Sequence, residues 1–323
     1  MKKYIFFLLF LYFLLPISVF AYSDYIIASG KNIGIELKSD NVIIVGSYNI
    51  GSYNVLRESD LRVGDKILKI DNYNITSTES MQQTINKINN DYVKITYKRN
   101  DSEYSTNIKL YKENDEYKTG LYVRDTIRGV ATLTYIDTNT KIFGALGHEI
   151  VEKSTKSRFE ADTGSIFDSY VTGITKSIDG NPGEKNARSN SQDIYGTVSE
   201  NTTSGIFGTY VKTLPQSKLY KVANPNEINL GHAQILTVIE GEKVEAFDIN
   251  ILKLNNNSNT KNILFEVTDE RLLTKTGGII QGMSGSPIIQ GDYIIGAVTH
   301  VLVDSPNKGY GIFITNMLEE GEN

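Results

Sequence analysis

The chain lacks cysteine altogether and has only three histidines among its 323 residues. The absence of cysteine excludes disulfides, thiolate metal sites and a cysteine nucleophile. The histidines follow no paired-ligand spacing, so we predict neither a metal centre nor a cofactor. Excess charge is also missing, because 33 basic and 38 acidic residues leave a net charge of only -5. That balance provides no electrostatic footprint for nucleic acid and argues against such a partner.

The N-terminus has the pattern of an export segment. Lys2 and Lys3 precede an apolar run over residues 4–20, and a small residue follows at Ala21. We predict that residues 1–21 are a signal peptide or an N-terminal membrane anchor, with cleavage after Ala21 favoured. The 302 residues that follow, 323 minus 21, would then be exported. They are enough for about two domains.

Short strands and one helix are expected between residues 25 and 110. Three segments have the β-branched, aromatic or alternating pattern of strands: Val42 to Val45, Lys66 to Ile70 and Val93 to Tyr97. Residues 78–88 repeat apolar side chains at helical spacing. Thr76 and Glu79 have the spacing of a capping box at the start of that helix.

The segment from Leu61 to Asp71 resembles the Gly-Asp segment of PDZ domains, which bind peptides. Upstream, Ile33, Gly34 and Ile35 are similar to the loop with which such domains hold a peptide carboxylate on backbone N–H groups. We therefore predict a PDZ domain over residues 22–115, with a membrane-protein tail or other peptide as its partner. Residues 111–118 are either a charged linker or a solvated edge strand.

From residue 116 to 323 the sequence has short β-branched runs and frequent turn signals, which indicate an all-β sandwich or barrel. Within it, residues 282–287 read Gly-Met-Ser-Gly-Ser-Pro, a Gly-flanked turn that would expose Ser284 as a nucleophile. A β-hairpin is predicted after it, over residues 287–298. A serine between strands, with no helix following, favours the chymotrypsin-like chain order of His, Asp and Ser.

That order requires a histidine before Ser284 to act as the base. His148 follows a Gly-rich strand end at the start of the β-region and is the preferred residue. His232 would leave only 52 residues before the serine, too few for a second barrel, and we interpret it as structural. His300 follows the strand after the serine and would at most line the site.

Taken together, these segments and the runs over residues 120–125, 143–148 and 267–313 resemble the stage IV sporulation protein B serine peptidases. The resemblance implies a mainly β chain, a PDZ domain followed by a chymotrypsin-like double β-barrel. It implies Ser284 as nucleophile, His148 as general base and Asp269 as third triad member. The N–H groups of Gly282 and Ser284 would form the oxyanion hole.

The identity of the orienting acid stays open on spacing alone. Asp162, Asp168 and Asp248 are alternatives to Asp269, because most chymotrypsin-like enzymes place this residue farther from the serine. Met283 stands where digestive enzymes of that class have Asp, which removes an activation switch based on an ion pair to a freed N-terminus.

The resemblance implies an exported sporulation signalling endopeptidase. Such an enzyme crosses the forespore inner membrane and cuts a membrane-associated regulator between the two membranes. The cut triggers maturation of the late mother-cell sigma factor. The alternative from another class is a non-catalytic binding module, in which the PDZ domain docks a partner and the barrels are an inactive scaffold.

Overall fold

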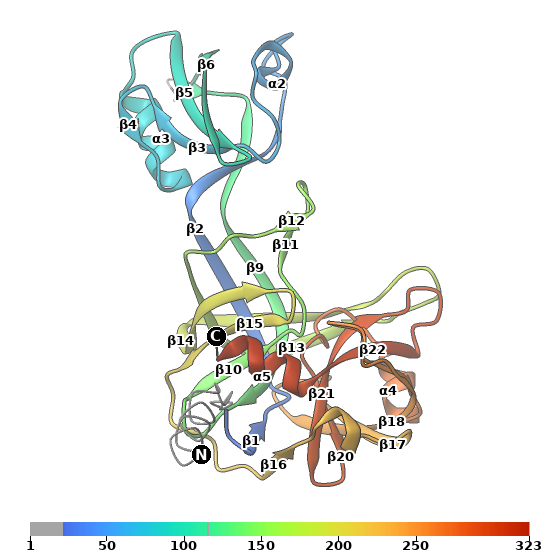
Figure 1. The fold of residues 1–323 in the computed structure, drawn as a ribbon. Coiled ribbons are helices and arrows are strands. Elements are labelled where there is room, and N and C mark those ends of the chain that lie inside the picture. The colour runs from blue at the N-terminus through green and yellow to red at the C-terminus, as the bar shows by residue number, and fades with distance from the viewer. Residues whose placement is uncertain (1–21, 115, 323) are drawn as a thin grey trace, which may run out of the picture.

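The structure, a computed structural model, describes residues 22–114 and 116–322. The predicted export segment, residues 1–21, lies outside the described residues. Figure 1 shows a small lobe and a larger β-rich lobe, joined by two long antiparallel strands, β2 (Asn32–Ser47) and β9 (Leu121–Ile136). No helix within the described ranges has the length and apolar character needed to cross a membrane.

The small lobe has the strands and the helix expected for a PDZ domain. Its own elements are α2 (Val55–Glu58), β3 (Lys66–Ile70), β4 (Tyr73–Asn74), α3 (Thr78–Lys87), β5 (Tyr92–Arg99) and β6 (Ser102–Lys109). The Gly-Asp segment works as a turn: Gly64 has a positive φ of 96°. Asp65 is buried, accepts from the Arg62 N–H at 2.7 Å and binds the Arg99 guanidinium at 2.7 Å. A buried carboxylate needs such partners.

The start of helix α3 differs from the prediction. Ser77 is the N-cap, and Ser77 and Ser80 satisfy each other's backbone N–H groups at 3.0 Å. Thr76 and Glu79 have the right spacing, but the helix begins one residue later than that pair requires. The helix then buries Met81 and Ile85 against the sheet, as its apolar spacing predicts.

The first barrel of the larger lobe is a closed ring of strands. Its order is β2, β9, β10 (Ile142–Ala145), β15 (Gly205–Tyr210), β14 (Glu184–Thr202) and β13 (Thr163–Thr175), which pairs with β2 again. Alternate side chains of these strands fill a core that includes Leu37, Leu133, Phe143 and Ile166. β1 (Tyr25–Ala28) lies beside β9 and pairs with β16 (Leu219–Val222).

The second barrel is also closed. Its order is β17 (Gly231–Val238), β18 (Val244–Leu254), β19 (Ile263–Val267), β22 (Lys308–Phe313), β21 (Tyr293–Val301) and β20 (Pro287–Gln290), which pairs with β17. The hairpin of β20 and β21 confirms the strand-turn-strand prediction for residues 287–298. Helical segments complete the lobe: a 3-10 turn (Pro225–Glu227), α4 (Glu270–Thr276) and α5 (Ile314–Gly321).

The lobes do not follow the predicted linear division at residue 115. Residues 32–38 of β2 pair with β13 and β9 inside the first barrel, and Ile33, Ile35 and Leu37 lie in its core. The PDZ lobe is therefore an insertion, carried between the distal halves of β2 and β9. The physical reason is that β2 and β9 pair with each other in both lobes, with register shifts between Lys38 and Ile43 and between Ile44 and Gly46.

Two small hairpins lie near the junction. One is β7 (Tyr111–Glu113) with β8 (Glu116–Lys118), so the charged stretch 111–118 forms strands. The other is β11 (Val151–Glu152) with β12 (Ser157–Arg158), which directly follows His148. Ion pairs Arg124–Glu152, at 2.9 Å, and Lys66–Glu160 connect this second hairpin region with the PDZ lobe and its supporting strand.

Candidate functional site

Ser284 lies in a tight loop that is pressed against the first barrel. Gly285 has a φ of 91°, and a Cβ there would stand 2.1 Å from the Thr132 carbonyl oxygen and 2.4 Å from the Leu146 nitrogen. Only glycine fits this approach. The Thr132 N–H donates to the Ser284 carbonyl at 3.0 Å, which fixes the loop on β9. The nucleophile candidate is thus seated between the two barrels.

His148 follows a left-handed turn at the end of β10. Leu146 and Gly147 have φ values of 74° and 72°, and they reverse the chain so that His148 leaves the barrel edge. Its Nδ1 lies 2.8 Å from the Glu149 carbonyl oxygen. Because a carbonyl only accepts, Nδ1 carries the hydrogen and the neutral ring keeps its lone pair on Nε2. This is the tautomer that a general base requires.

Both histidines near the loop are uncharged at neutral pH. Burial lowers the pKa of His148 below its usual 6.5, although the Glu149 carbonyl and carboxylate act in the opposite direction. The His300 ring lies beside it, with ring centroids 5.2 Å apart. Burial, together with His148 and Lys261, lowers the pKa of His300 to about 4. A neutral imidazole at position 148 can accept a proton.

Ser284 and His148 converge on strand β21. The Ser284 hydroxyl donates to the Thr299 carbonyl at 3.0 Å, and His148 packs against the next residue, His300. Gly147 contacts the same strand, since a Cβ there would lie 3.0 Å from the Thr299 side chain. In this arrangement the hydroxyl hydrogen points to Thr299, so the hydroxyl must turn about its Cβ–Oγ bond before its proton can pass to His148.

The amides predicted for the oxyanion hole are unengaged. Within the ranges that the structure describes, the N–H groups of Gly282 and Ser284 donate to no protein acceptor, whereas the Met283 N–H donates to the Ile280 carbonyl at 3.1 Å. Met283 itself is buried in the second barrel core. Two free donors on either side of an anchored peptide are what a developing oxyanion would use.

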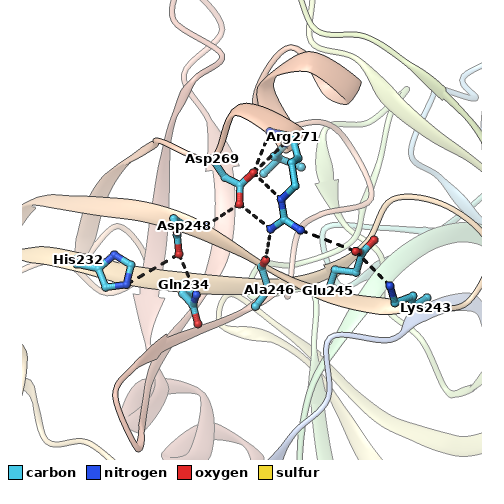
Figure 2. A network of polar contacts seen from close by, with 9 residues as sticks. His232, Gln234, Lys243, Glu245, Ala246, Asp248, Asp269 and Arg271 are labelled. Atoms are coloured by element: carbon cyan, nitrogen blue, oxygen red, sulfur yellow. Dashed lines mark hydrogen bonds and ion pairs between the residues drawn. The ribbon is translucent and has the colours of Figure 1, made fainter.

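Asp269 does not take the predicted orienting position. It is the N-cap of α4, where it accepts from the Arg271 and Leu272 N–H groups, and it binds the Arg271 guanidinium at 2.8 Å. Figure 2 shows this network, which continues to Ala246 and Glu245. The Arg271 hydrogen bonds lower the pKa of Asp269. No hydrogen bond joins Asp269 to His148 among the described residues. The Glu149 carbonyl is the acceptor for the His148 Nδ1–H instead.

The alternative acids are also engaged elsewhere. Asp162 accepts from the Asp40 N–H at 2.7 Å and Asp168 from the Tyr195 hydroxyl at 2.6 Å. Asp248 accepts from Gln234 at 2.8 Å and lies 3.9 Å from His232 Nε2, the contact seen at the left of Figure 2. The His232 side chain is exposed. It therefore has no buried structural role, contrary to the interpretation from the sequence.

The predicted carboxylate loop of the PDZ domain is also wrong in position. Ile33, Gly34 and Ile35 lie in the middle of the first barrel, with β9 on one side and β13 on the other. Both edges of this segment are hydrogen-bonded, and a Cβ on Gly34 would stand 2.1 Å from the Ser189 hydroxyl oxygen. No edge remains for a peptide to add a strand.

A groove does exist elsewhere on the PDZ lobe, between α3 and the start of β9. It is a hollow of about 160 Å³ whose apolar lining includes Met81, Ile85, Leu121 and Val123. Residues 121–124 of β9 pair with β2 on one edge only among the described strands. Gly120, with a φ of 75°, turns the chain into this strand. A free strand edge beside a helix is the geometry that PDZ domains use.

Two residues at the Ser284 loop were not found from the sequence. Thr132 lies in β9 and Lys185 begins β14, and each occupies a position that reads as ordinary strand. Both are buried. No local motif distinguishes them, because their partners come from segments about 50 and 150 residues away.

Comparison with known families and structures gives two family matches. The family described as SpoIVB peptidase S55 matches residues 115–318, and the PDZ domain family matches residues 32–110. No curated protein matches the chain at a significant level.

Three of the solved structures to which the chain is similar illustrate the likeness. The PDZ domain of the SdrC-like protein from Listeria monocytogenes is 27% identical, with TM-score 0.22, over 26% of this chain and 87% of that one. The inactive form of the Rv3671c protease is 14% identical, with TM-score 0.31, over 60% and 85%. The Ser343Ala mutant of Rv3671c from M. tuberculosis, an inactive form, is 12% identical, with TM-score 0.32, over 60% and 82%. The S55 match spans well over half of the sequence, so the chain belongs to the SpoIVB peptidase S55 family and carries a PDZ domain.

Proposed function

We propose that this protein is a serine endopeptidase in which Ser284 is the nucleophile and His148 the general base. The observation that carries the proposal is the convergence of both side chains on β21, beside two unengaged amides. Membership of a peptidase family supports the same reaction. The Glu149 carbonyl, rather than a carboxylate, fixes the tautomer of His148.

The reaction follows from these positions. The Ser284 hydroxyl turns its hydrogen away from Thr299, and Oγ attacks the scissile carbonyl carbon while His148 Nε2 takes its proton. The carbonyl oxygen becomes an oxyanion that accepts from the N–H groups of Gly282 and Ser284. His148 then protonates the leaving amine, the C–N bond breaks, and an acyl-enzyme forms. A water molecule, deprotonated by His148, hydrolyses this ester and restores Ser284.

The biological role that we propose rests on the family resemblance. The chain would be exported from the forespore and would cut a membrane-associated regulator in the space between the membranes, which triggers maturation of the late mother-cell sigma factor. Its PDZ lobe would hold an extended peptide of a membrane protein on the free edge of residues 121–124. The hollow beside Met81 and Ile85 would take an apolar side chain of that peptide.

Fluorophosphonate labelling tests the chemistry, because it requires an activated serine and not merely a folded one. Intact-mass analysis of the purified protein should show one adduct, abolished by Ser284→Ala. His148→Ala should slow labelling by about 10³-fold or more, and the double variant should be little worse, because the two residues act as a unit. Ser217→Ala is the control, since Ser217 is exposed and lies outside the Ser284 loop and its supporting hydrogen bonds.

The non-catalytic binding module predicts a different outcome. A folded wild type that acquires no adduct, or an adduct that survives Ser284→Ala, would contradict the peptidase assignment. Circular dichroism of each variant separates loss of chemistry from loss of fold.

A further inference from the structure

A buried lysine lies directly beneath the Ser284 loop and has no counter-ion among the residues that the structure describes. Lys185 is 6% exposed, and its Nζ donates to the hydroxyls of Thr237 at 3.0 Å and Thr132 at 3.4 Å. An isolated buried ammonium is costly, so a fold retains one only at a loss of stability. The mechanism described above makes no use of this group.

Three hydrogen bonds connect Lys185 and Thr132 to the loop, and one of them is the bond from the Thr132 N–H to the Ser284 carbonyl at 3.0 Å. The Lys185 N–H donates to the Gln281 carbonyl at 2.9 Å, and the Thr132 hydroxyl donates to the Gly282 carbonyl at 2.9 Å. The Lys185 side-chain carbons also lie 3.1–3.2 Å from the place that a Cβ on Gly282 would occupy. The lysine therefore supports the loop through its backbone, its methylenes and its amine.

Because peptide groups are planar, a hydrogen bond to the carbonyl of one residue also fixes the direction of the next residue's N–H. Two such bonds orient the two oxyanion donors. In a trans peptide the C=O and the following N–H point in opposite directions, and no cis peptide occurs among the described residues. The backbone N–H of Lys185 holds the Gln281 carbonyl, so the Gly282 N–H of the same peptide must face the opposite side. The Ser286 N–H holds the Met283 carbonyl at 2.9 Å in the same way, which turns the Ser284 N–H outward.

The direction of the hydrogen bonds depends on the charge of the amine. The Thr132 oxygen accepts from Lys185 and from the Ser286 hydroxyl, so its own hydrogen goes to Gly282. An ammonium can only donate and preserves this order. A neutral amine can accept the Thr132 hydrogen. The Gly282 carbonyl would then lose its donor, and the Gly282–Met283 peptide would be free to turn.

We propose that Lys185 is a positioning residue for the oxyanion hole, whose ammonium acts through the Thr132 hydroxyl to hold the Gly282–Met283 peptide, which lies between the donor N–H groups of Gly282 and Ser284. The inference rests on the proposed serine peptidase function. It assigns no contact with substrate to Lys185. A positive charge beneath the loop also favours a negative oxyanion above it.

The surroundings of the amine make it titratable near neutrality. The Thr132 hydroxyl of β9 and the Thr237 hydroxyl of β17 face the amine, and the residue paired with Lys185 across the hairpin, Ile174, is apolar. Glu184, next to it in β14, is exposed. Burial alone lowers the pKa of Lys185 to about 7, with no contribution from another charged group. The supporting ammonium is therefore lost as the pH rises through neutrality.

The test is the pH dependence of fluorophosphonate labelling, followed by intact mass, with Lys185→Met and Thr132→Val. Wild type should show a rising limb below pH 6.5 from His148 and a falling limb near pH 7. Lys185→Met should label about tenfold more slowly at pH 6.5, less than the ~10²–10³-fold cost of losing an oxyanion donor outright. It should lose the falling limb and keep a melting temperature at or above that of wild type.

Thr132→Val should slow labelling to the same extent, and the double variant should be no slower, because both residues act on one carbonyl. Lys185→Arg keeps the charge and, where it folds, should restore part of the rate. Labelling of Lys185→Met at the wild-type rate with an unchanged falling limb would overturn the proposal. A wild type without any adduct would instead overturn the peptidase function on which it rests.

Discussion

The Ser284 loop and the Asp269 network lie within the second half of the chain, yet they are built from different groups. The loop is held by backbone amides, threonine hydroxyls and one buried lysine. The Asp269 network consists of charged side chains, of which Arg271 and Lys243 are mostly exposed. The Asp269 carboxylate, close in sequence to the serine, is itself buried, but it caps α4 and pairs with the exposed Arg271.

This contrast teaches where electrostatics matters in the domain. Exposed ion pairs contribute little to stability, typically ~0–1 kcal/mol each. Around Ser284 and His148, burial is the main cause of the lowered pKa values of His148 and His300, and nearby charges contribute less. The Ser284 loop is held in place by close packing and backbone hydrogen bonds. The Asp269 network is held by the N-cap of α4 and by the ion pair with Arg271. Perturbing each in turn should produce effects of different kinds.

Outside the reacting residues themselves, Gly285→Ala should produce the largest effect, because its Cβ would collide with the Thr132 carbonyl at 2.1 Å. The loop must move by more than an ångström, and such a displacement costs about 10²-fold in rate. Fluorophosphonate labelling should fall by that factor. Gly291→Ala is the matched control, since Gly291 also has positive φ, 63°, but has no atom within 4 Å of the added carbon. Equal labelling of both variants would contradict the packing argument.

Asp269→Ala should affect stability more than chemistry. Loss of the N-cap and of the Arg271 pair should lower the free energy of unfolding by about 1–2 kcal/mol, measured by urea denaturation at pH 7. Arg271 lowers the pKa of Asp269, so this stabilisation is present above the ordinary Asp pKa and is lost as the pH falls below about 4. The difference between variant and wild type should shrink accordingly.

Asp269→Ser separates capping from triad membership. Serine keeps the N-cap bond but has no carboxylate, so most of the stability should return and the labelling rate should match wild type. A folded Asp269→Ser protein that no longer labels would show that Asp269 orients His148 in the working enzyme, against the arrangement described here.

Local signals in the sequence predicted much of the fold. The strands at 42–45, 66–70 and 93–97, the helix near 78–88 and the hairpin after Ser284 are all present. Such elements depend on side-chain periodicity over a few residues. Ser284 and His148 were also predicted as site residues because each lies in a Gly-rich turn, and the structure places both beside β21.

Properties that depend on distant partners were not predictable. Nothing near Ile33 shows that β2 continues unbroken from a barrel into the PDZ lobe, so the three-residue match was misplaced. The resemblance that implies Asp269 as a triad member says nothing about Arg271, two residues away, whose guanidinium binds the carboxylate. Lys185 was missed because its burial arises only when both barrels close over it.

His300→Ala should give the smallest effect, a shift in the rising limb of the labelling profile. The His300 ring packs on His148 and helps to exclude water from it. Burial is the main cause of the lowered pKa of His148, so removing the ring should raise this pKa toward 6.5. The midpoint of the rising limb should move upward by less than about one pH unit, with the maximal rate little changed.

The matched control is His232→Ala, because the His232 side chain is exposed and lies beside Asp248 in the charged network. It should leave the midpoint where it is in wild type. If His300→Ala also left it unchanged, the low pKa of His148 would have to come from the barrel edge and the Glu149 turn alone. The packing of the two imidazoles would then have no part in setting the pH at which the base becomes available.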